Sequence, residues 1–185
     1  MSSHSSVVLV EGDSDLAALT TLAARRGRDL AAEGVQVVVM SGATNVNRYV
    51  AELAPTGVRL GGLYDAQEQH FFRRALERHG LRHEGSPEPL EEQGFFVCVE
   101  DLEDEFLRAL EVEGMLAVVE AAGELRHFRV LQQQPAQRDR PIEAQLRRFL
   151  GIKAGRKARY GRLLAAAVPL DRVPPPLDGV LAWCR

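Results

Sequence analysis

Four short apolar segments constrain the fold of this chain more than any other feature. They occupy residues 7–10, 35–40, 58–64 and 94–99 and are rich in Val, Leu and Phe. Within each segment the apolar residues do not alternate cleanly with polar ones, which is typical of parallel strands that are covered on both faces. We therefore expect these segments to be the strands of one central sheet.

Helical patterns separate the expected strands. After a capping candidate at residue 13 or 14, leucines recur at helical spacing over residues 16–22. Segments 46–53 and 68–79 predict two more helices, and Gly80 is suited to end the second one. Strands that alternate with helices predict an α/β fold, Rossmann-like, with a central parallel sheet of about four strands flanked by helices and joined by right-handed crossovers.

The chain beyond residue 99 shows helical patterns and no further strong strand. Helices are expected within residues 102–122, 142–150 and 156–167, with a break at 132–135. Residues 170–177 hold three consecutive prolines and are expected to be extended or turned. We predict an α/β domain at residues 1–131 and a helical C-terminal extension at residues 132–185 that packs on it.

Composition narrows the class of protein. The net charge is −3 and 45% of the residues are hydrophobic, so overall charge does not indicate a nucleic-acid binder. Cys98 and Cys184 are too few for a disulfide framework or a zinc cluster. No stretch has the length and hydropathy of a membrane span, and the first residues lack the features of a signal peptide. We expect a cytoplasmic protein with no membrane partner.

Charge is unevenly distributed along the chain. Charged residues within 84–124 are almost all acidic, and those within 138–162 are mostly basic. An acidic centre can hold cations and a basic flank can hold a phosphate backbone. The alternative, which charge alone favours, is that two solvated helix faces of opposite sign pair with each other.

Carboxylates follow three of the four expected strands. Glu11 and Asp15 come after the first strand, Asp65 ends the third, and Asp101 and Glu103 follow the fourth. Because the carboxyl ends of parallel strands meet at one edge of a sheet, these acids are expected to share a crevice. Carboxylates a few ångströms apart repel one another, and oxygen ligands suit Mg²⁺ or Mn²⁺. The alternative is that each acid merely caps the following helix.

These residues resemble a known family. Glu11-Gly12 after an apolar strand, with Ser14-Asp15 opening a helix, resembles the first motif of Toprim domains. Residues 62–65, Gly-Leu-Tyr-Asp, resemble the start of their Asp-x-Asp motif, and residues 101–103 resemble the acidic third motif of Toprim domains in OLD-family (overcoming lysogenization defect) nucleases. The resemblance covers residues 7–110 and extends loosely to Gly155-Arg156-Lys157, where OLD-type domains carry a late functional lysine.

The resemblance implies a role for each motif residue. Glu11 is expected to be a metal ligand or a general acid/base, Asp15 to help bind a second metal ion, and Asp65 to be the central ligand. Glu103, with Asp101, is expected to complete the cage. Lys157 is expected to neutralise charge that develops on the cleaved phosphate.

One residue departs from the family pattern. The second aspartate of Asp-x-Asp is Gln67 here, and an amide oxygen can ligate a metal but brings no charge. Glu68 is a supporting candidate, although it lies one residue further along than the motif requires. A weakened site is therefore one alternative.

The basic residues near Lys157 are nucleic-acid-binding candidates. Helical spacing places Lys153, Arg156 and Arg159 near one face. A solvated face without a partner is an equally good interpretation of this segment.

The leading hypothesis is a nuclease that hydrolyses phosphodiester bonds in DNA with one or two Mg²⁺ or Mn²⁺ ions. OLD-family enzymes join the Toprim domain to an ATPase domain, whereas this chain shows no phosphate-binding loop, so any ATPase is expected to be a separate partner protein. One alternative is a catalytically weakened, Toprim-like module that binds nucleic acid or docks on a separate ATPase. A further alternative is an RNA-processing nuclease.

Overall fold

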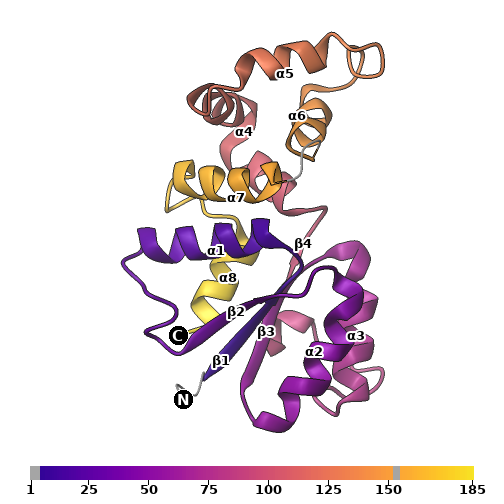
Figure 1. Ribbon diagram of the computed structural model, residues 1–185. Coiled ribbons are helices and arrows are strands. Elements are labelled where there is room, and N and C mark those ends of the chain that lie inside the picture. Colours follow the sequence, from indigo (N-terminus) through magenta and orange to yellow (C-terminus); the bar gives the residue numbers. More distant parts are fainter. Residues whose placement is uncertain (1–4, 152–154) are drawn as a thin grey trace.

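A four-stranded parallel sheet forms the centre of the computed structural model, which describes residues 5–151 and 155–185 (Figure 1). The strands are β1 (Ser6–Val10), β2 (Val35–Val39), β3 (Arg59–Asp65) and β4 (Phe95–Cys98), in the spatial order β2-β1-β3-β4. In the register of the sheet, Val8 of β1 lies between Val37 of β2 and Gly61 of β3. The expected α/β fold with its parallel sheet is confirmed.

Helices cover both faces of the sheet (Figure 1). One face carries α1 (Asp13–Arg25) and α8 (Pro175–Trp183), with α7 (Arg156–Ala167) packed on α1, and the other face carries α2 (Val46–Leu53) and α3 (Gln69–Arg78). Alternate residues of a strand point to opposite faces, so Val8 and Val10 join one apolar core while Val7 and Leu9 join the other. Because both faces are buried, the strands have no polar face, as their sequences indicated.

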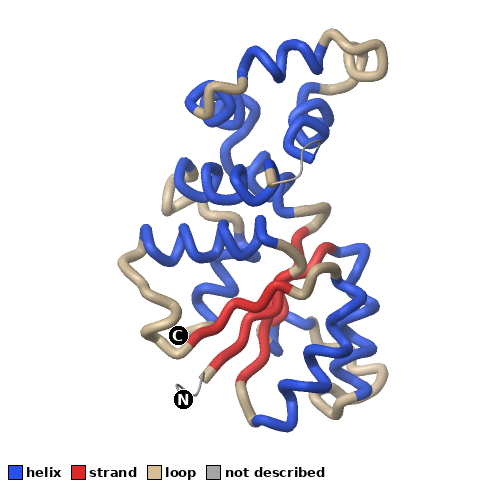
Figure 2. The backbone as a smooth tube through the Cα atoms, viewed as in Figure 1, coloured by secondary structure: helices blue, strands red, loops and turns tan. Residues whose placement is uncertain are grey.

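A helical lobe lies beyond the carboxyl ends of the strands (Figures 1 and 2). It consists of α4 (Leu102–Ala121), α5 (Leu125–Gln132) and α6 (Ile142–Gly151). Edge-to-face aromatic contacts continue from Phe128 to Phe149 and on to Tyr160 of α7, with ring centroids 5.4 Å and 6.3 Å apart. The C-terminal part is helical, as expected, while the division at residue 131 stays a prediction.

Among the described residues, the remaining elements are four short 3₁₀ helices. The 3₁₀ helices are η1 (Ala43–Asn45), η2 (Ala54–Thr56), η3 (Ala66–Glu68) and η4 (Leu90–Gln93). The expectation that residues 170–177 are wholly extended or turned is wrong at its end, because α8 begins at Pro175. Proline is compatible with the first turn of a helix, where its missing N–H has no partner to lose. Within residues 5–151 and 155–185, no helix combines the length and apolar character that a membrane crossing requires.

Gly161 brings α7 against the start of α1. A Cβ atom at this position would lie 2.5 Å from the backbone oxygen of Ser14, a distance that backbone cannot tolerate without moving. We expect Gly161→Ala to lower the free energy of unfolding by about 1–3 kcal/mol, because the two helices must separate. Chemical denaturation checks this prediction. Gly151→Ala is the control, since a Cβ there meets nothing within 4 Å; equal stability of the two variants would contradict the close approach.

Candidate metal centre

A pocket of about 360 Å³ opens at the carboxyl ends of the strands. Glu11 and Asp15 reach it from the β1–α1 junction, and Asp65 reaches it from the end of β3. Asp101 and Glu103 line it from the start of α4, and Lys157 of α7 lines it as well. The structure therefore brings together the acids that the sequence places after three different strands.

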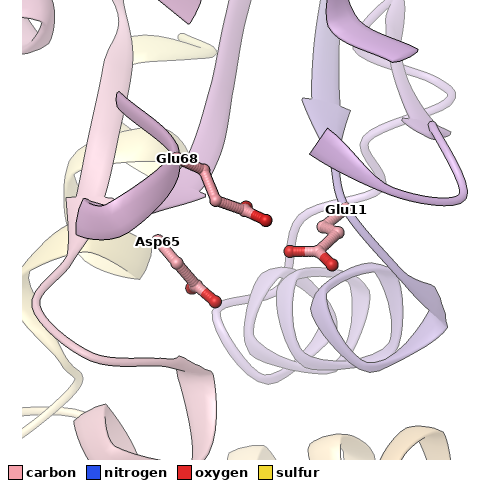
Figure 3. A group of neighbouring side chains, drawn as sticks. All are labelled: Glu11, Asp65 and Glu68. Atoms are coloured by element: carbon pink, nitrogen blue, oxygen red, sulfur yellow. The ribbon is translucent and has the colours of Figure 1, made fainter. Parts of the chain in front are cut away.

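Three carboxylates converge within this region (Figure 3). Glu11, Asp65 and Glu68 each offer an oxygen, and these oxygens all lie within 4.8 Å of one another. The 3₁₀ helix η3 turns the chain after Asp65, so that Glu68 returns toward Glu11. Oε2 of Glu68 is buried and has no hydrogen-bond partner, which is a costly state for a carboxylate oxygen.

Asp65 and Glu68 are hard to ionise without a cation. Burial, followed by the charges of Glu11 and Glu68, raises the pKa of Asp65 to about 8. Burial, the charge of Glu11 and a hydrogen bond with Glu11 raise the pKa of Glu68 to about 7. A cluster of oxygen ligands that repel one another fits a hard divalent cation such as Mg²⁺ or Mn²⁺, which would stabilise the ionised forms.

Asp15 lies beside the cluster and helps to shape the first loop. Its Oδ2 accepts a hydrogen bond of 2.9 Å from the backbone N–H of Gly12, at the start of α1. Burial raises the pKa of Asp15 to about 6, against the lowering effect of this hydrogen bond. Asp15 therefore combines the helix-capping role with a place in the pocket, and the two interpretations of this acid are not exclusive.

Asp101 and Glu103 have basic partners. Asp101 caps α4 by accepting a 2.8 Å hydrogen bond from the N–H of Asp104, and its other oxygen lies 2.9 Å from Nη2 of Arg147. Oε2 of Glu103 lies 3.5 Å from Nζ of Lys157. Burial raises the pKa of Glu103, whereas the charge of Lys157 lowers it. The acidic and basic segments do pair at these contacts, but the alternative of two solvated faces does not fit Glu103, whose side chain is buried.

Gln67 and Glu68, the two supporting candidates from the sequence, differ in their exposure and in their neighbours. Gln67, at the position of the missing aspartate, is exposed, whereas Glu68 is partly buried. Glu68, which the sequence offered only as a supporting residue, points at Glu11 and Asp65. The sequence indicated Glu68 only through its negative charge. The direction of its side chain depends on the 3₁₀ turn, which residue spacing does not reveal.

The proposed nucleic-acid face of α7 also needs correction. The Arg156 side chain is only 6% exposed, donates a 2.9 Å hydrogen bond to the Phe149 carbonyl and pairs with Glu124 at 3.2 Å. Arg156 is therefore placed to hold the helical lobe rather than to bind a phosphate. Arg159 is partly exposed and pairs with the same Glu124 at 3.4 Å. Lys153, the third candidate, lies outside the described residues.

Comparison with known proteins identifies the first part of the chain. The family model described as "Overcoming lysogenization defect protein-like, TOPRIM domain" matches residues 4–66, a segment that contains Glu11, Asp15 and Asp65. Residues 4–66 are thus similar to the Toprim domain of OLD-like proteins. No curated protein matches the chain.

Solved structures extend the likeness to nearly the whole chain. The C-terminal region of the Burkholderia pseudomallei OLD protein has a TM-score of 0.72 and 24% identity, over 98% of this chain and 97% of that one. The C-terminal region of the Xanthomonas campestris pv. campestris OLD protein, phased with iodine, has a TM-score of 0.70 and 24% identity, over 97% and 93%. The helical lobe, α7 and α8 therefore belong to a fold shared with the C-terminal regions of OLD proteins.

Proposed function

We propose that this chain hydrolyses phosphodiester bonds in DNA with a divalent cation, Mg²⁺ or Mn²⁺, held by Glu11, Asp65 and Glu68. One observation carries the proposal: three carboxylates from two neighbouring strand ends converge within 4.8 Å, and one of their oxygens is buried without a partner. The OLD-like Toprim match over residues 4–66 supports a nucleic-acid substrate.

Glu11, Asp65 and Glu68 would hold the divalent cation, which would supply Lewis-acid polarisation of a phosphate oxygen and would make an attacking water more acidic. Glu11 offers one oxygen to the acid cluster, and we assign to its carboxylate the role of accepting the proton of that water. Lys157 lines the same pocket with its side chain 55% exposed, so its Nζ can approach a phosphate from solvent. The lysine neutralises charge on the phosphate as the bond to the leaving oxygen breaks.

A DNA cleavage assay tests the proposal. Supercoiled and linear DNA are incubated with the protein and Mg²⁺, Mn²⁺ or Ca²⁺, and Glu11→Ala and Asp65→Ala are compared with the wild type. We expect cutting with Mg²⁺ or Mn²⁺ and a loss of at least about 100-fold in each variant, because each removes a ligand rather than a supporting contact. Asp13→Ala is the matched control, since Asp13 is an exposed acid of the same loop outside the pocket.

Three other outcomes would each overturn part of the proposal. Cutting that survives both substitutions would exclude the acid cluster as the site. Metal binding without cutting would favour a regulatory module that docks on a separate ATPase. Cleavage of RNA but not of DNA would favour an RNA-processing nuclease.

Glu68 and Gln67 give a sharper comparison within the same loop. We expect Glu68→Gln to weaken Mn²⁺ binding by about tenfold or more, because ligand charge strongly tunes the affinity of such sites. Gln67→Ala should leave the affinity unchanged, because this side chain is exposed to solvent. Calorimetric titration measures both. A weaker affinity in Gln67→Ala than in Glu68→Gln would show that Gln67, at the position of the second motif aspartate, supplies the ligand instead of Glu68.

A further inference from the structure

Arginines gather on the outer sides of α2 and α3, the two helices that cover the face of the sheet opposite α1 (Figure 1). Arg48 is exposed on α2, and Arg74 and Arg78 are exposed on α3. Residues four apart share one side of a helix, so Arg74 and Arg78 are about 6 Å apart along the axis of α3. Because α2 and α3 pack against each other, the three arginines belong to one surface, which we call the α2–α3 surface.

The arginines of the α2–α3 surface have no acidic partner among the described residues, where every ion pair uses other basic side chains. Each helix carries one acid, Glu52 on α2 and Glu77 on α3, and neither of them forms an ion pair with these arginines. Arg156 and Arg159 of α7, in contrast, share Glu124. The positive charge of the α2–α3 surface is therefore open to a partner from outside the chain.

The contacts that hold two of these side chains are with uncharged groups. Nη1 of Arg78 and Nε2 of His79 each lie 3.3 Å from Oδ1 of Asn47, which ties the end of α3 to α2. The guanidinium of Arg48 lies over the ring of Tyr49, 4.7 Å from its centroid. These contacts orient the guanidinium groups but do not neutralise them. A phosphate group supplies both the missing charge and the paired oxygens that a guanidinium binds best.

The α2–α3 surface begins at the rim of the acidic pocket. Glu68 of the acid cluster immediately precedes α3, and Ser41 and Gly42, which line the pocket, lie just ahead of η1 and α2. At about 1.5 Å per residue, Arg74 and Arg78 lie about 9 Å and 15 Å from the level of Glu68 along the helix. A strand with one phosphate in the pocket can therefore continue along α3 to these arginines.

We infer, on the basis of the DNA-cleaving function proposed above, that Arg48, Arg74 and Arg78 bind the phosphate backbone of the DNA that leads into the pocket. The chain has a net charge of −3, so a local positive surface is needed to attract a polyanion. Contacts with phosphates supply affinity and orientation, and they carry no sequence preference of their own. The α2–α3 surface takes the role that the sequence assigned to α7.

The salt dependence of DNA binding tests this inference without any measurement of cleavage. Fluorescence anisotropy measures the affinity of the protein for a labelled DNA duplex in EDTA over a series of salt concentrations. The logarithm of the binding constant falls with the logarithm of the salt concentration, with a slope of about 0.9 for each phosphate contact. We expect the triple variant Arg48→Gln/Arg74→Gln/Arg78→Gln to lower this slope by about 2–3 and to weaken binding at low salt by at least about tenfold.

Two matched variants control for charge and for position. The same three arginines replaced by lysine should keep the slope of the wild type, because lysine retains the charge that releases counterions. Replacing three exposed arginines of the helical lobe by glutamine should also keep it, although the same charge is removed; these are Arg126, Arg138 and Arg140. If the triple variant does not fold, Arg74→Gln alone should lower the slope by about 1. The Arg74 side chain is exposed, so this change should not affect folding.

The possible results separate the inference from the proposed function. An unchanged slope in the glutamine variant of the α2–α3 surface, or an equal loss in the lobe variant, would overturn the inference and leave DNA cleavage standing. A wild type that binds RNA but no DNA would overturn the inference together with the DNA substrate. A wild type whose slope depends on these arginines but which cuts no DNA with any metal would overturn the proposed function and leave the DNA-binding surface standing.

Discussion

Replacing Asp65 with asparagine is expected to abolish DNA cleavage while leaving the metal-free protein at least as stable as the wild type. The isosteric amide removes a charged ligand, so we expect a loss of at least about 100-fold in the cleavage rate. The same change removes a buried carboxyl whose pKa is raised to about 8 by burial and by the charges of Glu11 and Glu68. At pH 8 the neutral amide no longer repels its neighbours.

The gain in stability should be modest, because Asp65 is only partly buried and solvent screens the repulsion. We expect about 1 kcal/mol, which corresponds to a rise of roughly 2–4 °C in the melting temperature of a domain of this size. Scanning calorimetry of metal-free protein at pH 8 measures it. Asp139→Asn, a change at an exposed acid far along the chain, is the control. A melting temperature several degrees below that of the wild type would show that Asp65 is a structural residue instead.

Divalent metal should stabilise the protein, and the stabilisation should grow between pH 6 and pH 8.5. The pKa of Asp65 is raised from its ordinary value of 3.8 to about 8 in the folded protein, and that of Glu68 is raised to about 7. Groups whose folded pKa is raised contribute stability at low pH and lose it as the pH rises through the folded pKa. Metal-free protein should therefore lose stability over this range.

A bound cation reverses this loss because it favours the ionised carboxylates, and it competes with protons for the same oxygens. The difference in melting temperature with and without Mg²⁺ or Mn²⁺ should thus be small at pH 6 and largest at pH 8.5. Ligand that binds only the folded state at 100 times its dissociation constant adds about 2.7 kcal/mol. Thermal melts of wild type and Asp65→Asn check this prediction. A shift that is equal at both pH values, or equal in the two proteins, would contradict it.

The positions of Glu11 and Asp65 could be predicted from the sequence because the carboxyl ends of parallel strands lie at the same edge of a sheet. Each residue directly follows a buried apolar run, and the carboxyl ends of β1 and β3 are neighbours in the sheet. The same reasoning placed Asp101 and Glu103 at the pocket. It did not reveal their partners, because Arg147 and Lys157 come from helices that are distant in sequence.

Features that depend on local turns or on tertiary burial could not be predicted from the sequence. Glu68 reaches the acid cluster through a single 3₁₀ turn, and residue spacing does not predict the direction of that turn. Arg156 looked like part of a basic surface, yet it is buried over the ring of Phe149, 4.2 Å from its centroid. Its burial depends on how the helical lobe packs on α7, which the charge pattern of α7 alone does not contain. The three prolines within residues 170–177 indicate an extended or turned segment, yet α8 begins at Pro175.

The most direct test of the central claim is to locate Mn²⁺ by anomalous diffraction in crystals of this chain. The account predicts a strong anomalous peak between the carboxylates of Glu11, Asp65 and Glu68, with Mn–O distances near those of octahedral oxygen coordination. The peak should be absent in crystals of Asp65→Asn. Mn²⁺ bound elsewhere on the chain, with these three carboxylates left free, would contradict the account.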